Sequence, residues 1–268
     1  MNYSRIVTKI NSVLEMKRKL VGVRFIFNEE GFAETNAPQP KSKMSYCRMV
    51  RKASTGGKMK VNFDNFGCFA GARALGIVEV DKGYAAGLYY DGCGLYQDLP
   101  TAKEATNNIS ICNHSAYGLE IKPLAEFDID PQIIIIITNP FNAMRLVQGY
   151  TYNYGPYSAF KMMGNQAICS ECTAYPYETN NISFSLLCAG ARRNGFEKDE
   201  VGIGITANKF RGMVDGLFST VTPVENNKNK KVIEKKLKEN KISDISITYN
   251  HSYGDKLHRY DSNLFFKK

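Results

Sequence analysis

The chain has 268 residues, of which 43% are apolar and 12% aromatic, so it is large enough to bury a substantial core. Its first residues contain no apolar leader, and its longest apolar run, five isoleucines at 133–137, is too short to cross a bilayer. We therefore expect a cytoplasmic protein without membrane contact. The net charge is +9, but residues 226–241 alone contain seven lysines and two glutamates. Such a run is typical of a solvated helix or tether, which argues against nucleic acid as a partner.

The first half of the chain shows alternating helix and strand signals. Apolar spacing predicts a helix over residues 4–16 and a strand over 21–27. A short helix is predicted over 44–53, after a proline-containing loop. The segment NFGCFAGARALGIVEV, at 65–80, is predicted to run from a loop through a short helix into a strand. The glycine- and tyrosine-rich stretch 87–98 is predicted to be irregular.

The clearest local architecture is a strand-to-helix junction in the middle of the chain. The isoleucine-rich strand ends at Thr138, Asn139 can cap the next helix, and Pro140 fits its first turn. Free backbone N–H groups at a helix start can bind an anion, with Asn142 and Arg145 nearby. A plain asparagine cap would explain the same residues.

Further strands and helices alternate after this junction. A helix is predicted over 163–178, a strand over 182–187 that runs into a turn, and a strand over 201–206. The predicted fold class is therefore α/β or α+β.

We expect one globular body made of two similar, pseudo-symmetric halves, followed by a basic C-terminal extension. The body is placed at 1–224, with its halves at about 1–115 and 116–224. Residues 225–268 are the predicted lysine-rich linker and extension.

An internal repeat of cysteines suggests these halves. Seven cysteines occur, at 47, 68, 93, 112, 169, 172 and 188, and in the cytoplasm they should be reduced. Cys47 precedes Cys68 by 21 residues, and Cys169 precedes Cys188 by 19. In each pair the first cysteine lies on a predicted helix, and the second is followed within three residues by Gly-Ala-Arg. If the halves pack about a pseudo-twofold axis, the four thiols meet.

Four thiolates can bind zinc or an iron–sulfur cluster. A [4Fe–4S] cluster is favoured because the glycines of the two turns, Gly71 and Gly190, let backbone N–H groups approach the sulfurs. Arg73 and Arg192 could offset the negative charge of the cluster.

Two other cysteines could also serve as ligands. Zinc sites more often use closely spaced cysteines, and Cys169 and Cys172 would share one face of an α-helix. Cys172 is therefore the alternative ligand. Cys112 and His114, two residues apart, could bind a metal from a strand face. A lone histidine in such a segment is more often a hydrogen-bonded surface residue.

These motifs also carry a family resemblance. The segments SYCRMVRKA, GCFAGARALG, NPFNAMRLVQ, GNQAICSECTAYPYET and CAGAR together resemble the uncharacterised ArCR family, or domain of unknown function 169, of archaea and anaerobic bacteria. The resemblance spans about residues 3–215. It implies that the recurring cysteines of the family correspond to Cys47, Cys68, Cys169 and Cys188.

Common catalytic motifs are missing from the sequence. It contains neither a dinucleotide-binding glycine motif after a strand nor a phosphate-binding loop. Only three histidines occur, and two of them lie in the C-terminal tail. We therefore assign no catalytic residue.

Two hypotheses of function follow. The first is an iron–sulfur protein with one [4Fe–4S] cluster and a redox, electron-transfer or sensing role, with a redox partner protein. The second is a metal-free or zinc-stabilised module that binds a small ligand in an aromatic pocket near Asn139–Tyr157, where Tyr150, Tyr152 and Tyr154 alternate. In either case we expect a homo-oligomer.

Overall fold

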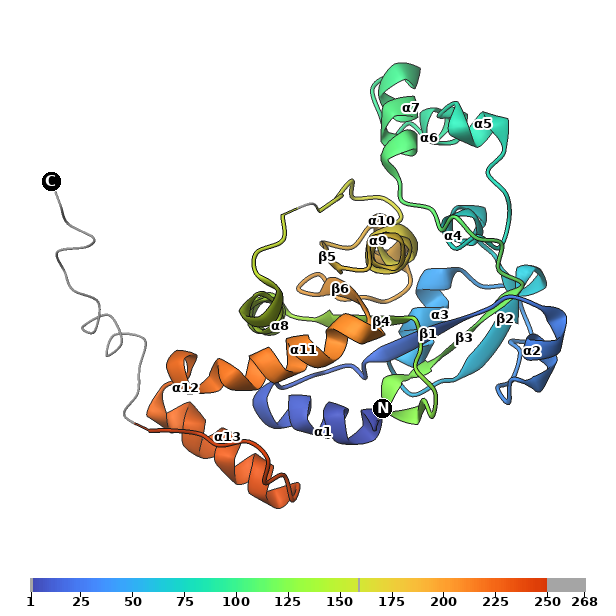
Figure 1. Ribbon diagram of the computed structural model, residues 1–268. Helices are drawn as coiled ribbons and strands as arrows, with labels where there is room; N and C mark the ends of the chain where they lie inside the picture. Colours follow the sequence, from blue (N-terminus) through green and yellow to red (C-terminus); the bar gives the residue numbers. More distant parts are fainter. Residues whose placement is uncertain (1, 159, 250–268) are drawn as a thin grey trace, which may run out of the picture.

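Six strands form an antiparallel sheet at the centre of the computed structural model, which describes residues 2–158 and 160–249 (Figure 1). The strands are β1 (Val21–Ile26), β2 (Met59–Asn62), β3 (Gly118–Pro123), β4 (Ile133–Thr138), β5 (Ile182–Ser185) and β6 (Val201–Thr206). Their order across the sheet is β2-β3-β1-β4-β6-β5, and every neighbouring pair is antiparallel. The protein is thus of mixed α and β structure, and the antiparallel pairing favours α+β of the two predicted classes.

Helices surround this sheet. The α-helices are α1 (Tyr3–Val13), α2 (Glu29–Glu34), α3 (Tyr46–Ala53), α4 (Phe69–Ala74), α5 (Lys82–Ala85), α6 (Leu88–Gly92), α7 (Leu99–Asn108), α8 (Pro140–Tyr154), α9 (Tyr175–Thr179), α10 (Ala189–Arg193), α11 (Ala207–Ser219), α12 (Val221–Val224) and α13 (Asn227–Glu239). Two short 3-10 helices, η1 (Phe63–Asn65) and η2 (Leu124–Glu126), and a π-helix, η3 (Ala167–Ala174), complete the described elements.

The isoleucine run forms the centre of two cores because both faces of β4 are buried. On one face Ile134 and Ile136 pack with the apolar side chains of α1, α8 and α11. On the other face Ile133 and Ile135 pack with residues of α3, α4, η3 and α10. Cys169, Cys172 and Cys188 belong to this second core and Cys47 packs against it, while Cys68 precedes α4, which contributes Ala72 and Ala74 to it.

Polar residues fix the starts of the helices near the site. The side chain of Ser45 accepts a hydrogen bond from the backbone N–H of Arg48 and caps α3. Asn139 caps α8 in the same way, with Pro140 in its first turn, as predicted. The sequence signals for these two helices are therefore confirmed.

Glycines allow η3 to lie directly on β6. A Cβ atom at Gly204 would lie inside van der Waals contact of the Cys172 carbonyl oxygen, and one at Gly202 would be 2.8 Å from the Cys172 sulfur. The repeated glycine of VGIGIT thus serves close packing between a helix and a strand.

Two local predictions were wrong. The expected strand at the end of segment 65–80 is not formed. Gly76, with φ of +68°, turns the chain after α4, and the Ile77 N–H donates to the Ala72 carbonyl oxygen instead of to a neighbouring strand. The stretch 87–98, expected to be irregular, contains α6, which lies with α5 and α7 at one end of the molecule (Figure 1). Tyr84 and Tyr90 form the small core of this group.

The lysine-rich segment forms α13, which lies beside α1. Its apolar side chains Ile233 and Leu237 are buried with Val221 and Ile242, whereas most of its lysines are exposed. No helix within the described ranges is both long and apolar enough to span a membrane. Residues 250–268 of the expected extension lie outside the described part of the chain.

Candidate metal centre

The structure brings Cys47, Cys68, Cys169 and Cys188 together from four separate elements. Cys47 lies in the first turn of α3, and Cys169 lies in η3. Cys68 and Cys188 are the N-cap residues of α4 and α10, and neither side chain caps its helix. None of the four forms a disulfide. The thiols therefore remain available as ligands on one face of the sheet.

The thiols of Cys47 and Cys188 are hydrogen-bonded to each other. The Cys47 S–H donates to the Cys188 sulfur, and this hydrogen bond, with backbone N–H donors of Ala167, Ala191 and Gly190, lowers the pKa of Cys188 to about 5 despite its burial. The same hydrogen bond, with burial, raises the pKa of Cys47 well above its usual value. Cys188 is thus a thiolate at neutral pH, stabilised by backbone N–H groups at the start of a helix.

Burial and the neighbouring sulfurs disfavour ionisation of the Cys169 and Cys47 thiols. Burial, and then the neighbouring Cys68 and Cys188, raises the pKa of the Cys169 thiol. Cys169 and Cys68 also raise the pKa of Cys47, after its hydrogen bond and burial. A cation between these sulfurs would lower the pKa values of the thiols, because it would stabilise their ionised forms.

The Gly-Ala-Arg turns lie against the sulfurs through their glycines. The position of a Cβ atom on Gly71 is 3.9 Å from the Cys68 sulfur and 4.0 Å from Cβ of Cys169, and that on Gly190 is 3.6 Å from the Cys188 sulfur. These glycines therefore let the backbone approach the thiols closely.

The arginines of the two turns make other contacts. Arg73 pairs with Asp81 and its guanidinium lies 4.7 Å from the ring centroid of Tyr84. Arg192 donates to the carbonyl oxygens of Leu186 and Glu200. Arg192 thus fixes the segment that leads into Cys188, whereas Arg73 holds the start of α5 against α4.

Cys172 faces the sheet. Its sulfur is fully buried and lies beside Gly202 of β6. The expectation that it shares a face with Cys169 assumed an α-helix, but the segment is a π-helix, whose wider turn separates residues three apart. Cys93 lies exposed at the end of α6.

Sequence reasoning missed a buried carboxyl group beside this centre. Glu171 accepts hydrogen bonds from the Ser185 hydroxyl and from the Met163 N–H, and the Leu187 N–H donates to the same hydroxyl. Burial raises the pKa of Glu171. This network holds the segment that leads into Cys188, and no spacing in the sequence marks it.

The region proposed for the aromatic pocket is organised differently from the prediction. Tyr150, Tyr152 and Tyr154 lie on α8, so residues two apart do not share one face. Arg145 is fully buried and uses its guanidinium within the protein, against Glu225 at 3.2 Å and Gln148 at 2.8 Å. A cavity of about 280 Å³ beside Asn139 is lined by residues of α8, α13 and their neighbours, and none of its lining residues is a tyrosine.

Comparison with known proteins identifies the family of this chain. The model of the uncharacterised ArCR family matches residues 9–216. The chain is 26% identical over 212 residues to the uncharacterized protein MJ0308 of Methanocaldococcus jannaschii, an alignment that covers 78% of this chain and 91% of that protein. No solved structure matches the chain. The protein belongs to the uncharacterised ArCR family, the domain of unknown function 169.

Proposed function

We propose that the protein binds one [4Fe–4S] cluster through Cys47, Cys68, Cys169 and Cys188 and has a redox, electron-transfer or sensing role. The observation that carries this proposal is the convergence of four free thiols from four helical elements. When bound, the cluster would supply one-electron redox chemistry.

The chemistry of the donor set fits a cluster. Four thiolates are the usual ligands of [4Fe–4S] clusters, and N–H donors to the sulfurs tune their potential. Here the N–H groups of Ala167, Gly190 and Ala191 already act on Cys188. Clustered thiols without a counter-charge also need a cation to ionise together.

We infer that the arrangement of the four sulfurs suits a cluster better than a single zinc ion. With Zn–S bonds of about 2.3 Å, a tetrahedral zinc site needs sulfurs about 3.8 Å apart. Among the described residues, one group of three ligand atoms lies within 4.8 Å of one another. That group contains none of the four cysteines. A cluster suits the wider spacing because it places a separate iron atom behind each sulfur.

Strand order supports an internal duplication. Outward from the central β1–β4 pair, the sheet reads β1, β3, β2 on one side and β4, β6, β5 on the other. If the first half includes β3 and the second begins at β4, a boundary later than the predicted one at 115/116, the chain order of each half is a strand, a cysteine on a helix, a strand, a cysteine before a short helix, and a strand. We infer that the two halves are pseudo-symmetric and that each contributes two ligands.

Exposed apolar residues beside the four-cysteine centre support the proposal that a redox partner protein binds there. Cys47 and Cys68 are half-buried, so one edge of the site is near solvent. Phe69, which follows Cys68, is 61% exposed, and Leu186, two residues before Cys188, is 59% exposed. Apolar residues beside a cofactor edge suit a transient protein contact.

Single cysteine replacements test the proposal. Each of Cys47→Ser, Cys68→Ser, Cys169→Ser and Cys188→Ser, purified without oxygen, should lose most of its iron and sulfide. Cys93→Ser, at an exposed cysteine, should retain the content of the unchanged protein. Equal iron in all five variants would refute the ligand assignment.

A further inference from the structure

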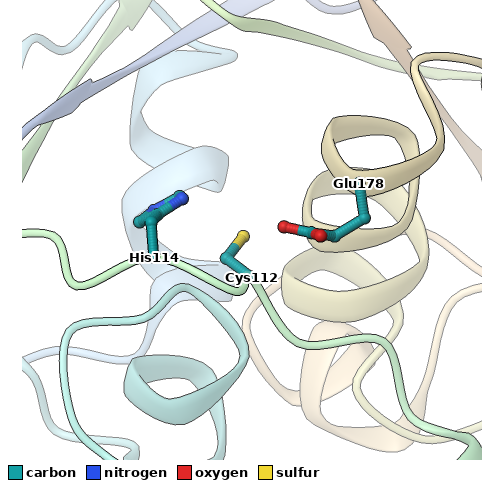
Figure 2. Close-up of side chains that lie close together, drawn as sticks. All are labelled: Cys112, His114 and Glu178. Atoms are coloured by element: carbon teal, nitrogen blue, oxygen red, sulfur yellow. The ribbon is translucent and has the colours of Figure 1, made fainter.

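A second group of metal-ligand side chains lies between the loop before β3 and helix α9. Figure 2 shows Cys112 between His114 and Glu178, with the Glu178 carboxylate extending toward the other two. One ligand atom of each residue lies within 4.8 Å of the others. Cys112 is buried, His114 is half-buried and Glu178 is exposed, so the group lies at the edge of the core.

The imidazole of His114 lacks hydrogen bonds of normal geometry. Both of its ring nitrogens are shielded from solvent and have no partner of normal hydrogen-bond geometry. Burial lowers the pKa of His114, although Glu178 and the Leu75 carbonyl act in the opposite direction. Its ring packs among those of Phe25, Phe27 and Tyr177, with centroids 4.6, 5.2 and 4.9 Å away. A buried imidazole without partners is unfavourable, and coordination of a metal ion would satisfy one of its nitrogens.

Backbone hydrogen bonds hold the loop of Cys112 in place. The Cys112 N–H donates to the Ala74 carbonyl oxygen at 2.9 Å, and the Ala116 N–H donates to that of Gly76 at 2.8 Å. Gly76 has φ of +68°, and a Cβ atom there would overlap the His114 carbonyl oxygen. Both ligands from this loop are thus positioned by the end of α4.

Asn113 orients the third ligand. Its backbone N–H donates to Oε1 of Glu178 at 2.9 Å, and its Nδ2 donates to Oε2 at 2.6 Å. A carboxylate has about four acceptor sites, so these two bonds leave capacity for a metal ion. Outer partners of this kind commonly orient metal ligands.

We propose that Cys112, His114 and Glu178 form a second metal site, separate from the four-cysteine centre, that binds a zinc-type divalent ion. One sulfur, one imidazole nitrogen and one carboxylate oxygen are all zinc ligands, and three protein ligands leave the fourth tetrahedral position open. A cavity of about 300 Å³ borders Cys112, Asn113 and His114, so water or a small ligand can reach this side of the site.

Cobalt titration of the full-length protein tests the proposal. Co²⁺ is spectroscopically visible, and a bound thiolate adds a charge-transfer band. In protein purified without oxygen, one Co²⁺ per chain should bind with such a band and be displaced by Zn²⁺. His114→Phe and Cys112→Ala should weaken binding at least about 100-fold, and Asn113→Ala by about 10- to 100-fold.

Matched controls separate this site from the other thiols. Cys93→Ser should bind Co²⁺ like the unchanged protein, because Cys93 is exposed at the end of α6. Cys169→Ser, which removes a ligand of the four-cysteine centre, should retain the cobalt band at Cys112. A band that disappears in Cys169→Ser but persists in Cys112→Ala would assign it to the four-cysteine centre and overturn the proposal.

His114→Phe separates a metal ligand from a residue that serves packing only. Phenylalanine retains a ring among Phe25, Phe27 and Tyr177 and removes the unpartnered nitrogens, so this variant should fold. Zn²⁺ should raise the thermal midpoint of the unchanged protein and not that of His114→Phe. An equal rise in both, or folded unchanged protein that binds neither Zn²⁺ nor Co²⁺, would overturn the proposal.

Discussion

The four-cysteine centre and the Cys112–His114–Glu178 group adjoin the same core on one face of the sheet. They differ in which interactions their side chains lack. At the four-cysteine centre the thiols have one another as neighbours, and the hydrogen bond between Cys47 and Cys188, burial and the neighbouring sulfurs raise the pKa values of Cys47 and Cys169. At the second group the imidazole lacks a hydrogen-bond partner. Under our two proposals, the first arrangement binds a cluster and the second binds a single ion. Helix α4 connects them, with Cys68 at its start and the Ala74 carbonyl, which binds the Cys112 loop, at its end.

Removal of a core ligand should have the largest effect. In protein that holds the cluster, Cys169→Ser should lower the free energy of unfolding by more than about 4 kcal/mol, because a cofactor is lost along with a buried side chain. Cys172→Ala, in the same π-helix, should cost about 1–3 kcal/mol and leave the iron content unchanged. Urea unfolding without oxygen measures both. Similar losses of stability and iron would show that the two cysteines do not differ in role.

The second-largest loss of stability is expected where η3 packs closely on β6. Gly204→Ala should cost about 1–3 kcal/mol and lower iron occupancy, since a Cβ atom there overlaps the Cys172 backbone and must displace the segment that carries Cys169. Gly92→Ala is the matched control because a Cβ atom at Gly92 meets no neighbour. Thermal unfolding and iron analysis of both variants check the prediction. A stable, fully loaded Gly204→Ala would show that the close approach is unimportant.

The free energy of unfolding of the metal-free protein should depend on pH through the thiols of the four-cysteine centre. The pKa of Cys188 is lowered to about 5 from an unfolded value of about 8.5, so unfolding takes up a proton between these pH values. Stability should therefore fall as pH decreases from about 8.5 to 5. Cys47 has the opposite sign: its raised pKa contributes stability below about 8.5 that is lost as pH rises further.

Chemical unfolding of reduced, metal-free protein at several pH values measures this dependence. Cys188→Ala should reduce the slope between pH 5 and 8.5, with a difference of about 1–3 kcal/mol across the range. Other groups, His114 among them, also titrate in this pH range. The effect of Cys188 is therefore the difference in slope between the variant and the unchanged protein. Identical slopes would contradict a thiolate at Cys188.

The smallest effect is expected at the exposed cysteine. Cys93→Ser should change the free energy of unfolding by less than about 0.5 kcal/mol, because the side chain is exposed and packs in neither centre. Thermal unfolding checks this value. A larger loss would mean that the α5–α7 group depends on that thiol.

The two sites were predictable to different degrees. The proximity of Cys47, Cys68, Cys169 and Cys188 was predictable because the sequence repeats a similar cysteine spacing and the same Gly-Ala-Arg turn, a signal that a single sequence contains. Glu178 was not identified, because it lies 65 residues from its partner Asn113 and on a different element. Only the fold brings it to His114.

Secondary structure was predictable where apolar spacing and caps agreed. The strand of five isoleucines and the helix capped by Asn139 formed as predicted. The π-helix η3 was not predictable, because its backbone depends on contact with Gly202 and Gly204 of a strand about thirty residues later. For the same reason, the different orientations of Cys169 and Cys172 required the structure.

Quantitation of iron, sulfide and zinc, with a visible spectrum, in protein purified without oxygen tests the central claim most directly. The account predicts brown protein with about four irons and four sulfides per chain, with a colour that a reductant bleaches. Zinc should account for at most one further ion. Colourless, folded protein without iron would contradict the cluster.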